Sequence, residues 1–294
     1  MKSHATGHYT RGRLPSIERT VQFANHLSIV QTGVAAAKVV FAMALLSISS
    51  VVAPIVGALM AFAVYNGNNL ADLEEDAVNK PACAAVTVRW KREIAVVSAA
   101  AALAAIALAA YAGGLVALGI VFVPVLACGL YSLPLVPGER ADRLKDVFGL
   151  NTALVAAAWA IPLTYLPVAI GGQVPLSHTV PVVALLFLRT FISVEVFNVR
   201  DIAGDRASGV ATLPASLGLP ATKHVLIFLD GVALAVAIAA ADVLPAVAVV
   251  AVLAVTVYSM GLTAILDRIN NFQLACLAKD GEYVALGVVA LLLI

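Results

Sequence analysis

Long apolar segments alternate with short polar ones along the chain after residue 26. Most of the apolar segments are about 20 residues long, which is the length that an α-helix needs to cross a bilayer. We expect two helices within 27–65, divided near Pro54, and further helices over 94–112, 115–135, 147–166, 180–198, 223–241, 244–266 and 282–294. The pattern predicts an all-α, polytopic membrane bundle of about nine transmembrane helices around a central cavity.

Composition agrees with this pattern. Of 294 residues, 62% are hydrophobic and 12% are charged, whereas soluble domains carry about 25% charged residues. The formal net charge of +1 provides no strongly basic face, so we expect no nucleic acid partner. Residues 1–26 are polar and basic and form a predicted cytoplasmic N-terminal tail, and residues 27–294 form a single predicted membrane domain.

The basic residues fall on one side of the predicted bundle. Of the 18 Lys and Arg residues, Lys38 and Arg189 lie within expected helices and Lys223 lies at the end of one. The remaining 15 (18 minus 3) lie in the tail and in expected loops over 68–93, 137–146, 199–222 and 267–281. The positive-inside rule makes this side cytoplasmic. The chain is therefore predicted to be a multi-pass protein of the cell membrane.

A polar motif follows the second predicted helix. Asn68, Asp72 and Asp76 are four residues apart, so on a helix they lie on one face about 6 Å from each other. Like charges at this spacing repel. We therefore expect a positive charge between the carboxylates.

A second motif closes the sixth predicted helix, where Asn198, Asp201 and Asp205 share one face. Asp72 and Asp201 are separated by 129 residues, and Asp76 and Asp205 are separated by 129 residues as well. Equal separations indicate two equivalent halves, which is a common construction in membrane bundles. Solvated loop charges would explain one such pair, but two matched pairs at helix ends indicate function.

Carboxylates facing one cavity are typical of a divalent cation site. Mg²⁺ prefers hard oxygen ligands and is often bound by one or two carboxylates together with phosphate oxygens of a substrate. The predicted catalytic residues and metal ligands are Asp72, Asp76, Asp201 and Asp205, with Asn68 as a further ligand. The pattern predicts Mg²⁺ and a diphosphate substrate.

The two motifs resemble the paired Asp-rich motifs of the UbiA superfamily of intramembrane prenyltransferases. The first has the form NxxxDxxxD, and the second has the form DxxxD and is followed by Gly209, Thr212, Leu213 and Pro214. The resemblance extends over nearly the whole chain. It implies a Mg²⁺-dependent enzyme that binds an isoprenyl diphosphate and a lipophilic acceptor among membrane lipids.

The resemblance also extends to the loop after the fourth helix, with Tyr131, Arg143 and Lys145. It implies that Lys145, or else Arg143, contacts the diphosphate, although the positive-inside rule also explains these charges. The other predicted substrate contacts are Asn68, Asn198 and Lys38. A lysine at mid-membrane depth should face the cavity or pair with a carboxylate.

Two departures leave the acceptor open. Cys83 and Ala84 stand where many relatives carry a basic residue and a proline, and Asn198 stands where many carry Asp. The main hypothesis is prenyl transfer to an aromatic or other lipophilic acceptor. The alternatives are a UbiA-type terpene synthase, which cyclises the prenyl diphosphate, and a non-enzymatic membrane transporter or binding protein.

Overall fold

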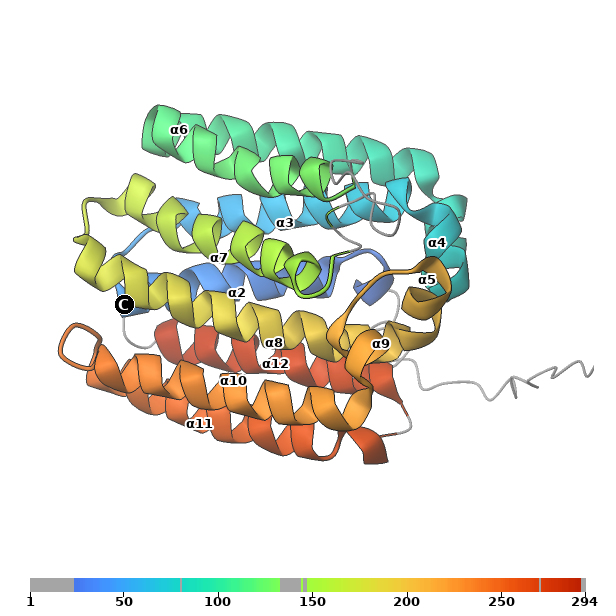
Figure 1. Cartoon of the computed structure of the whole chain (residues 1–294). Helices are drawn as coiled ribbons and strands as arrows, with labels where there is room; N and C mark the ends of the chain where they lie inside the picture. The colour runs from blue at the N-terminus through green and yellow to red at the C-terminus, as the bar shows by residue number, and fades with distance from the viewer. Residues whose placement is uncertain (1–23, 80, 133–143, 145–146, 270, 292–294) are drawn as a thin grey trace, which may run out of the picture.

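The computed structural model describes residues 24–79, 81–132, 144, 147–269 and 271–291, and this part of the chain is built from helices and their connections. The helices are α2 (Ile29–Leu45), α3 (Val52–Ala71), α4 (Leu73–Asn79), α5 (Pro81–Arg89), α6 (Lys91–Ser132), α7 (Leu150–Gly171), α8 (Leu176–Ser208), α9 (Leu213–Leu217), α10 (Leu219–Ala239), α11 (Ala246–Ala264), η2 (Leu266–Arg268) and α12 (Phe272–Leu291). The long helices lie side by side in one bundle, with α4, α5 and α9 at one end (Figure 1). The predicted all-α bundle is confirmed.

Element α6 is two helices that meet at a glycine. Gly114 has φ 62° and ψ −151°, a conformation that costs residues with a Cβ far more than it costs glycine. The chain turns back there, between the helices that were expected over 94–112 and 115–135 (Figure 1). With α6 counted as two, the described residues form nine helices of at least 17 residues.

The outer surface of the bundle suits a membrane. In the described part, α6, α7, α8, α10 and α11 are long and apolar enough to cross one. Large hydrophobic side chains point outward from them, among them Leu103, Phe228 and Val250, which are 68%, 69% and 63% exposed. A soluble protein rarely exposes apolar area on this scale. These helices therefore present a surface that lipid can solvate.

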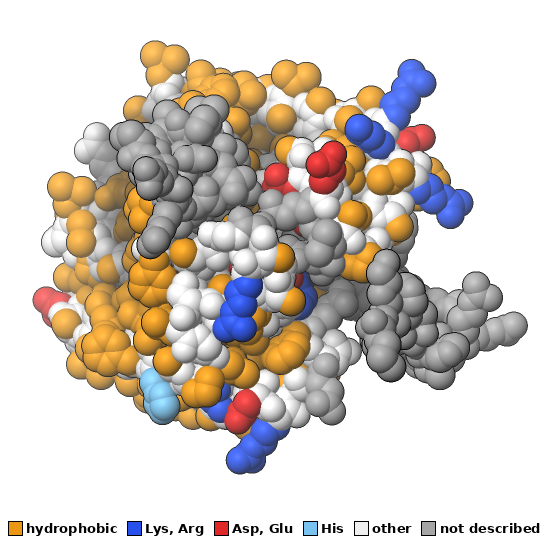
Figure 2. All heavy atoms as spheres, turned by 45° about the vertical axis from the view of Figure 1, so that its right-hand side comes forward, with side chains coloured by type: hydrophobic (Ala, Val, Ile, Leu, Met, Phe, Trp, Pro, Cys, Tyr) orange, Lys and Arg blue, Asp and Glu red, His pale blue; other side chains and the backbone are white. Residues whose placement is uncertain are grey.

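Charged groups gather at the end that carries α4, α5 and α9. Figure 2 brings this end forward and shows most of its visible Lys, Arg, Asp and Glu side chains there, with hydrophobic side chains around the flanks. Charged side chains are costly inside hydrocarbon and favourable near the interface. This end of the bundle therefore lies at a membrane–water boundary.

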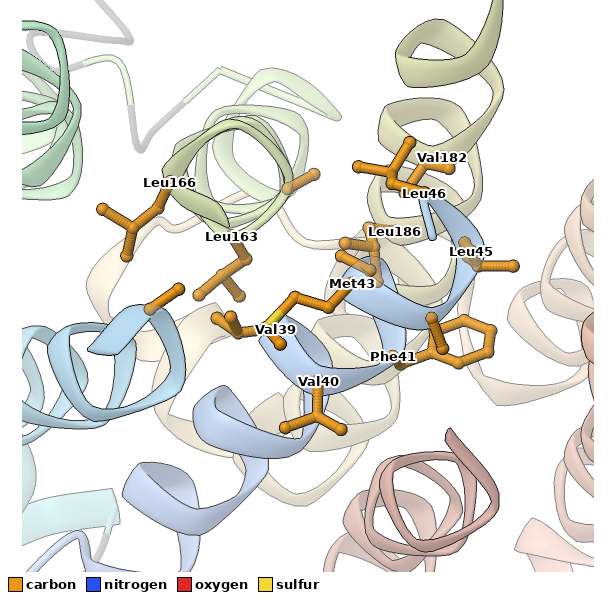
Figure 3. Close-up of a cluster of buried hydrophobic side chains, with 14 of the residues drawn as sticks. Val39, Val40, Phe41, Met43, Leu45, Leu46, Leu163, Leu166, Val182 and Leu186 are labelled. Atoms are coloured by element: carbon orange, nitrogen blue, oxygen red, sulfur yellow. The ribbon is translucent and has the colours of Figure 1, made fainter. Parts of the chain in front are cut away.

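Helix α2 runs through the middle of the bundle. Its Val39 and Met43 lie near Leu163 of α7, and Leu186 of α8 lies close to the same helix (Figure 3). Residues 38–45 of α2 are all buried. A helix that is apolar on all sides is stable only when other elements or lipid surround it. Residues on α2, including Lys38, are therefore held rigidly inside the protein.

Several predicted boundaries were wrong at the charged end. Helix α8 continues to Ser208 instead of ending at residue 198, and α4 and α5 fill much of the loop expected over 68–93. Membrane length sets where an apolar segment ends, but a helix can continue into water when its polar groups hydrogen-bond there. Both acidic motifs are therefore attached to rigid helices.

The last helix begins at Phe272, ten residues before the predicted start at 282. Lys279 was assigned to a cytoplasmic loop, but it lies within α12 and is buried. The prediction failed because the charges of Lys279, Asp280 and Glu282 interrupt the apolar pattern. Those charges have partners inside the bundle, which hydropathy along one helix cannot reveal.

Candidate functional site

The first acidic motif crosses the junction between α3 and α4. Asp72 interrupts the helix, yet its backbone N–H donates to the Asn68 carbonyl at 2.9 Å. The N–H of Asp76 donates in turn to the Asp72 carbonyl at 2.8 Å. These bonds continue the i to i−4 pattern of an α-helix across the junction. Asn68, Asp72 and Asp76 therefore retain helical spacing, and Asp76 is buried.

The second motif lies on the last turns of α8, and α4 packs against α8. The two motifs consequently meet at one end of the bundle. Arg200 lies between them: its Nε and Nη2 donate to Oδ1 and Oδ2 of Asp201, both at 2.8 Å. Its charge also interacts with that of Asp76. Arg200 thus provides positive charge beside the carboxylates of both motifs.

The predicted metal ligands differ in the hydrogen bonds that their carboxylate oxygens accept. Arg200 engages both carboxylate oxygens of Asp201, and the Thr212 hydroxyl donates to Asp205 Oδ2 at 2.9 Å. Within the described residues, no three His, Cys, Asp or Glu side chains are grouped as a ready metal site. The donor types suit Mg²⁺. Binding it would require these side chains to rearrange, with Arg200 releasing Asp201.

Glu195 stabilises the second motif through hydrogen bonds inside the bundle. Its Oε1 accepts a hydrogen bond from Thr152 at 2.5 Å, and its Oε2 accepts from Asn198 at 3.2 Å and from the backbone N–H of Leu213 at 3.3 Å. The side chain is fully buried. It therefore ties α7, the Asn198 side chain and the start of α9 together, and the Thr212 that caps α9 also holds Asp205.

Glu195→Gln should destabilise the protein by about 1–3 kcal/mol, because an amide NH₂ would face donors that now bind a carboxylate oxygen. Thermal unfolding in detergent would measure the loss. Glu93→Gln is the control, since Glu93 is an exposed glutamate in the first turn of α6. Equal midpoints for the two variants would show that Glu195 does not brace this region.

The central cavity lies beside the second motif and has a volume of about 250 Å³. It is lined by residues of α2, α3, α7, α8 and α12, and three predicted site residues are among them: Lys38, Asn198 and Asp201. Apolar residues such as Val155 form much of the rest of its wall. The cavity therefore joins a charged end to an apolar interior.

A smaller cavity of about 160 Å³ adjoins the central one and contains Asn68 in its wall. Tyr65 and Trp159 line both cavities, and their rings stack with centroids 5.1 Å apart. Neither residue was predicted to belong to the site, because single aromatic residues in an apolar span usually serve packing. The stacked pair forms a partition between the two spaces.

A third cavity, of about 310 Å³, lies at the outer side of Arg200 and Tyr65. Cys83 lines it, so the residue that departs from the common basic position does face this end of the site. His26 also lines it, and burial lowers the pKa of His26. The imidazole is therefore largely neutral at pH 7, and Arg200 is the charged residue in this wall.

Lys38 faces the central cavity from α2. Its Nζ donates to Thr190 Oγ1 at 3.1 Å and lies 4.1 Å from the centre of the Tyr283 ring. A hydrogen bond and a cation–π contact both stabilise an ammonium group away from water. Lys38 therefore lines the cavity, and its charge interacts with that of the Asp280 carboxylate in the same wall.

The remaining predicted contacts cannot be placed. Arg143 and Lys145 lie outside the described residues. The backbone of Tyr131 belongs to α6, but its side chain is outside the described set. Their roles stay predictions.

A network of buried charges lies next to the cavity. Arg189 of α8 pairs with Glu282 of α12 at 2.7 Å and with Asp230 of α10 at 3.5 Å. Lys279 pairs with Glu282 at 2.9 Å, and it also donates to Ser259, whose hydroxyl donates to Asp230 at 2.7 Å. These side chains join α8, α10, α11 and α12. Arg189 thus has two carboxylate partners, Glu282 and Asp230.

Known proteins resemble this chain both in sequence and in fold. The model of the UbiA prenyltransferase family matches residues 26–273. The apo structure of a UbiA homolog from Aeropyrum pernix K1 superposes with a TM-score of 0.67 at 20% identity, covering 90% of this chain and 98% of that one. No curated protein matches the sequence.

Two further structures share the fold. A UbiA homolog from Archaeoglobus fulgidus bound to GPP and Mg²⁺ has a TM-score of 0.65 at 14% identity, covering 92% of this chain and 99% of that one. A digeranylgeranylglyceryl phosphate synthase has a TM-score of 0.57 at 17% identity, covering 94% and 97%. At these identities the structural likeness establishes the fold.

Proposed function

Because the chain belongs to the UbiA prenyltransferase family, we propose that it transfers a prenyl group from an isoprenyl diphosphate to a lipophilic acceptor. One observation carries the proposal: Arg200 pairs with Asp201 and interacts electrostatically with Asp76, and Arg200 and Asp201 line an apolar-walled cavity. The charged end suits a diphosphate, and the apolar wall suits its hydrocarbon chain.

Mg²⁺ is the proposed cofactor. Its support is the donor chemistry of the two motifs and the relative from Archaeoglobus fulgidus that binds GPP and Mg²⁺. The proposed ligands are Asp72, Asp76, Asp201, Asp205 and Asn68. When bound, the metal would neutralise charge that develops on the diphosphate leaving group.

The protein's own residues would carry out the rest. Arg200, once released from Asp201, can donate two parallel hydrogen bonds to a diphosphate. As the C1–O bond breaks, its electron pair leaves with the diphosphate and C1 becomes an allylic cation. The rings of Tyr65, Trp159 and Phe197 line the cavity, and aromatic rings stabilise nearby cations and exclude water. The acceptor can then capture the cation before water does.

The protein is a multi-pass membrane protein, as its apolar helices and family membership establish. We propose that the end with the two motifs faces the cytoplasm. The support is the excess of Lys and Arg in the segments at that end. Soluble diphosphates and Mg²⁺ would then reach the site from the cytoplasm, and the hydrocarbon chain would occupy the apolar part of the central cavity.

A direct assay tests the proposal. Purified protein is incubated with Mg²⁺ and geranyl, farnesyl or geranylgeranyl diphosphate, with and without a panel of aromatic and alcohol acceptors. We expect prenylated acceptor and diphosphate release, and the loss of both when EDTA is added. Cyclic hydrocarbon formed without acceptor would instead support a terpene synthase. Absence of diphosphate release with all three substrates would overturn both enzymatic functions.

A further inference from the structure

Among the buried charged side chains that the structure describes, six lie apart from the two motifs and Glu195, and only some of these six face the cavity. Arg189, Asp230, Lys279 and Glu282 pair with each other. The other two, Lys38 and Asp280, line the central cavity together with Asp201. Charged side chains are costly to bury, so those that form no ion pair in the network are candidates for ligand binding.

Asp280 lacks part of its hydrogen bonding. The residue is 6% exposed, and its Oδ2 accepts no hydrogen bond from any residue that the structure describes. Nearly all buried polar atoms in native proteins have a partner, and an unsatisfied one raises the free energy of the folded state. A donor from a bound molecule would satisfy this oxygen.

Lys38 offers complementary chemistry beside it. An ammonium group has three donors, and Lys38 uses one of them on Thr190. Lys38 and Asp280 line the same cavity, and their charges interact across it. Together they present a donor and an acceptor to one small group. A hydroxyl is such a group, because its oxygen accepts one hydrogen bond while its proton donates another.

We propose that Lys38 and Asp280 form the acceptor subsite, and that Asp280 accepts the proton of an acceptor hydroxyl. This inference rests on the proposed prenyl transfer. The C1–O bond to diphosphate breaks first and its electron pair leaves on the diphosphate, and the hydroxyl oxygen then forms a bond to the C1 cation. The hydroxyl proton passes to the Asp280 carboxylate, and Lys38 binds the oxygen as its proton leaves.

The acceptor class follows from the same chemistry. It carries a hydroxyl group, as an alcohol or a phenol does, on an apolar body that fits beside Trp159 and Val155. Masking the hydroxyl as a methyl ether removes the proton that Asp280 would take. We therefore expect the ether of an active acceptor to be inert as a substrate.

Asp280→Asn tests the inference, with diphosphate release, prenylated acceptor and prenyl alcohol measured in the same reaction. Loss of a general base lowers transfer about 100-fold or more. Diphosphate release should persist, with water capturing the cation, so prenyl alcohol should replace the transfer product. Asp242→Asn is the control, because Asp242 is an exposed carboxylate between α10 and α11, at the other end of the bundle.

The outcomes separate the competing explanations. A parallel loss of diphosphate release and transfer in Asp280→Asn would make the residue structural and overturn the inference, as would unchanged transfer or an active acceptor without a hydroxyl. Absence of diphosphate release by the wild-type protein would instead count against the proposed function itself. If Asp280→Asn does not fold, Lys38→Met provides the test: KM for the acceptor should rise at least tenfold while KM for the prenyl diphosphate stays unchanged, and equal changes in both would overturn the inference.

Discussion

Asp201→Asn should lower kcat/KM for prenyl transfer about 100- to 1000-fold, the range seen when one preorganised electrostatic group is removed from an active site. The substitution keeps the shape of the side chain and removes its charge. Asp201 lines the cavity and holds Arg200. Without the charge of Asp201, Mg²⁺ binds less tightly and Arg200 loses its ion-pair partner. Diphosphate binding and the ionisation step should therefore both weaken.

The same experiment can show whether the two motifs act as one unit. Asp72→Asn should have an effect of similar size, and the double variant should lose little more than either single one, because groups that act together are not additive. Steady-state turnover in detergent or in liposomes measures all three. Asp242→Asn should match the wild type. Independent, multiplying losses from the two motifs would contradict a single shared site.

Arg189→Met should destabilise the fold by about 3–5 kcal/mol, since removing one partner leaves buried carboxylates without their countercharge. Arg189 is fully buried and pairs with Glu282 and Asp230. The six buried groups comprise three cations (Lys38, Arg189, Lys279) and three anions (Asp230, Asp280, Glu282), so the cluster is neutral as it stands. The single substitution leaves it with one excess negative charge.

Adding Glu282→Gln to Arg189→Met restores neutrality and should recover much of the lost stability. Thermal unfolding in detergent measures the single variants and the double variant. Asp267→Asn is the matched control, because its partner Lys223 lies at the surface, where ion pairs contribute little. If the double variant loses as much stability as the two single variants lose together, contacts other than charge balance stabilise these helices.

Local patterns in the sequence were enough to predict the helical bundle and the acidic motifs. The apolar spans, the glycine pair at Gly114 and the i to i+4 spacing of Asp72 and Asp76 are all properties of neighbouring residues. Each is fixed by backbone geometry or by the thickness of a bilayer. They are therefore visible without knowing which helices touch.

Features that depend on contacts between helices were missed. The role of Arg200 depends on the packing of α4 against α8, and the role of Asp280 depends on the position of α12 beside the cavity. The start of α12 was misplaced because charges that mark it as polar have partners inside the bundle, as Glu282 has in Arg189 of α8. Hydropathy treats each helix as alone in lipid, so it assigns such a segment to water.

The charges on α12 also affect how the protein is made. A lysine or an aspartate at mid-membrane depth opposes insertion by roughly 2.5–3.5 kcal/mol each, and α12 carries Lys279, Asp280 and Glu282 within four residues. This helix therefore enters the bilayer poorly by itself. Its insertion depends on α8 and α10 being available to offer Arg189 and Asp230. Biogenesis of the protein should thus end with a cooperative step, in which the final helix leaves the translocon only as it docks onto helices that were synthesised earlier.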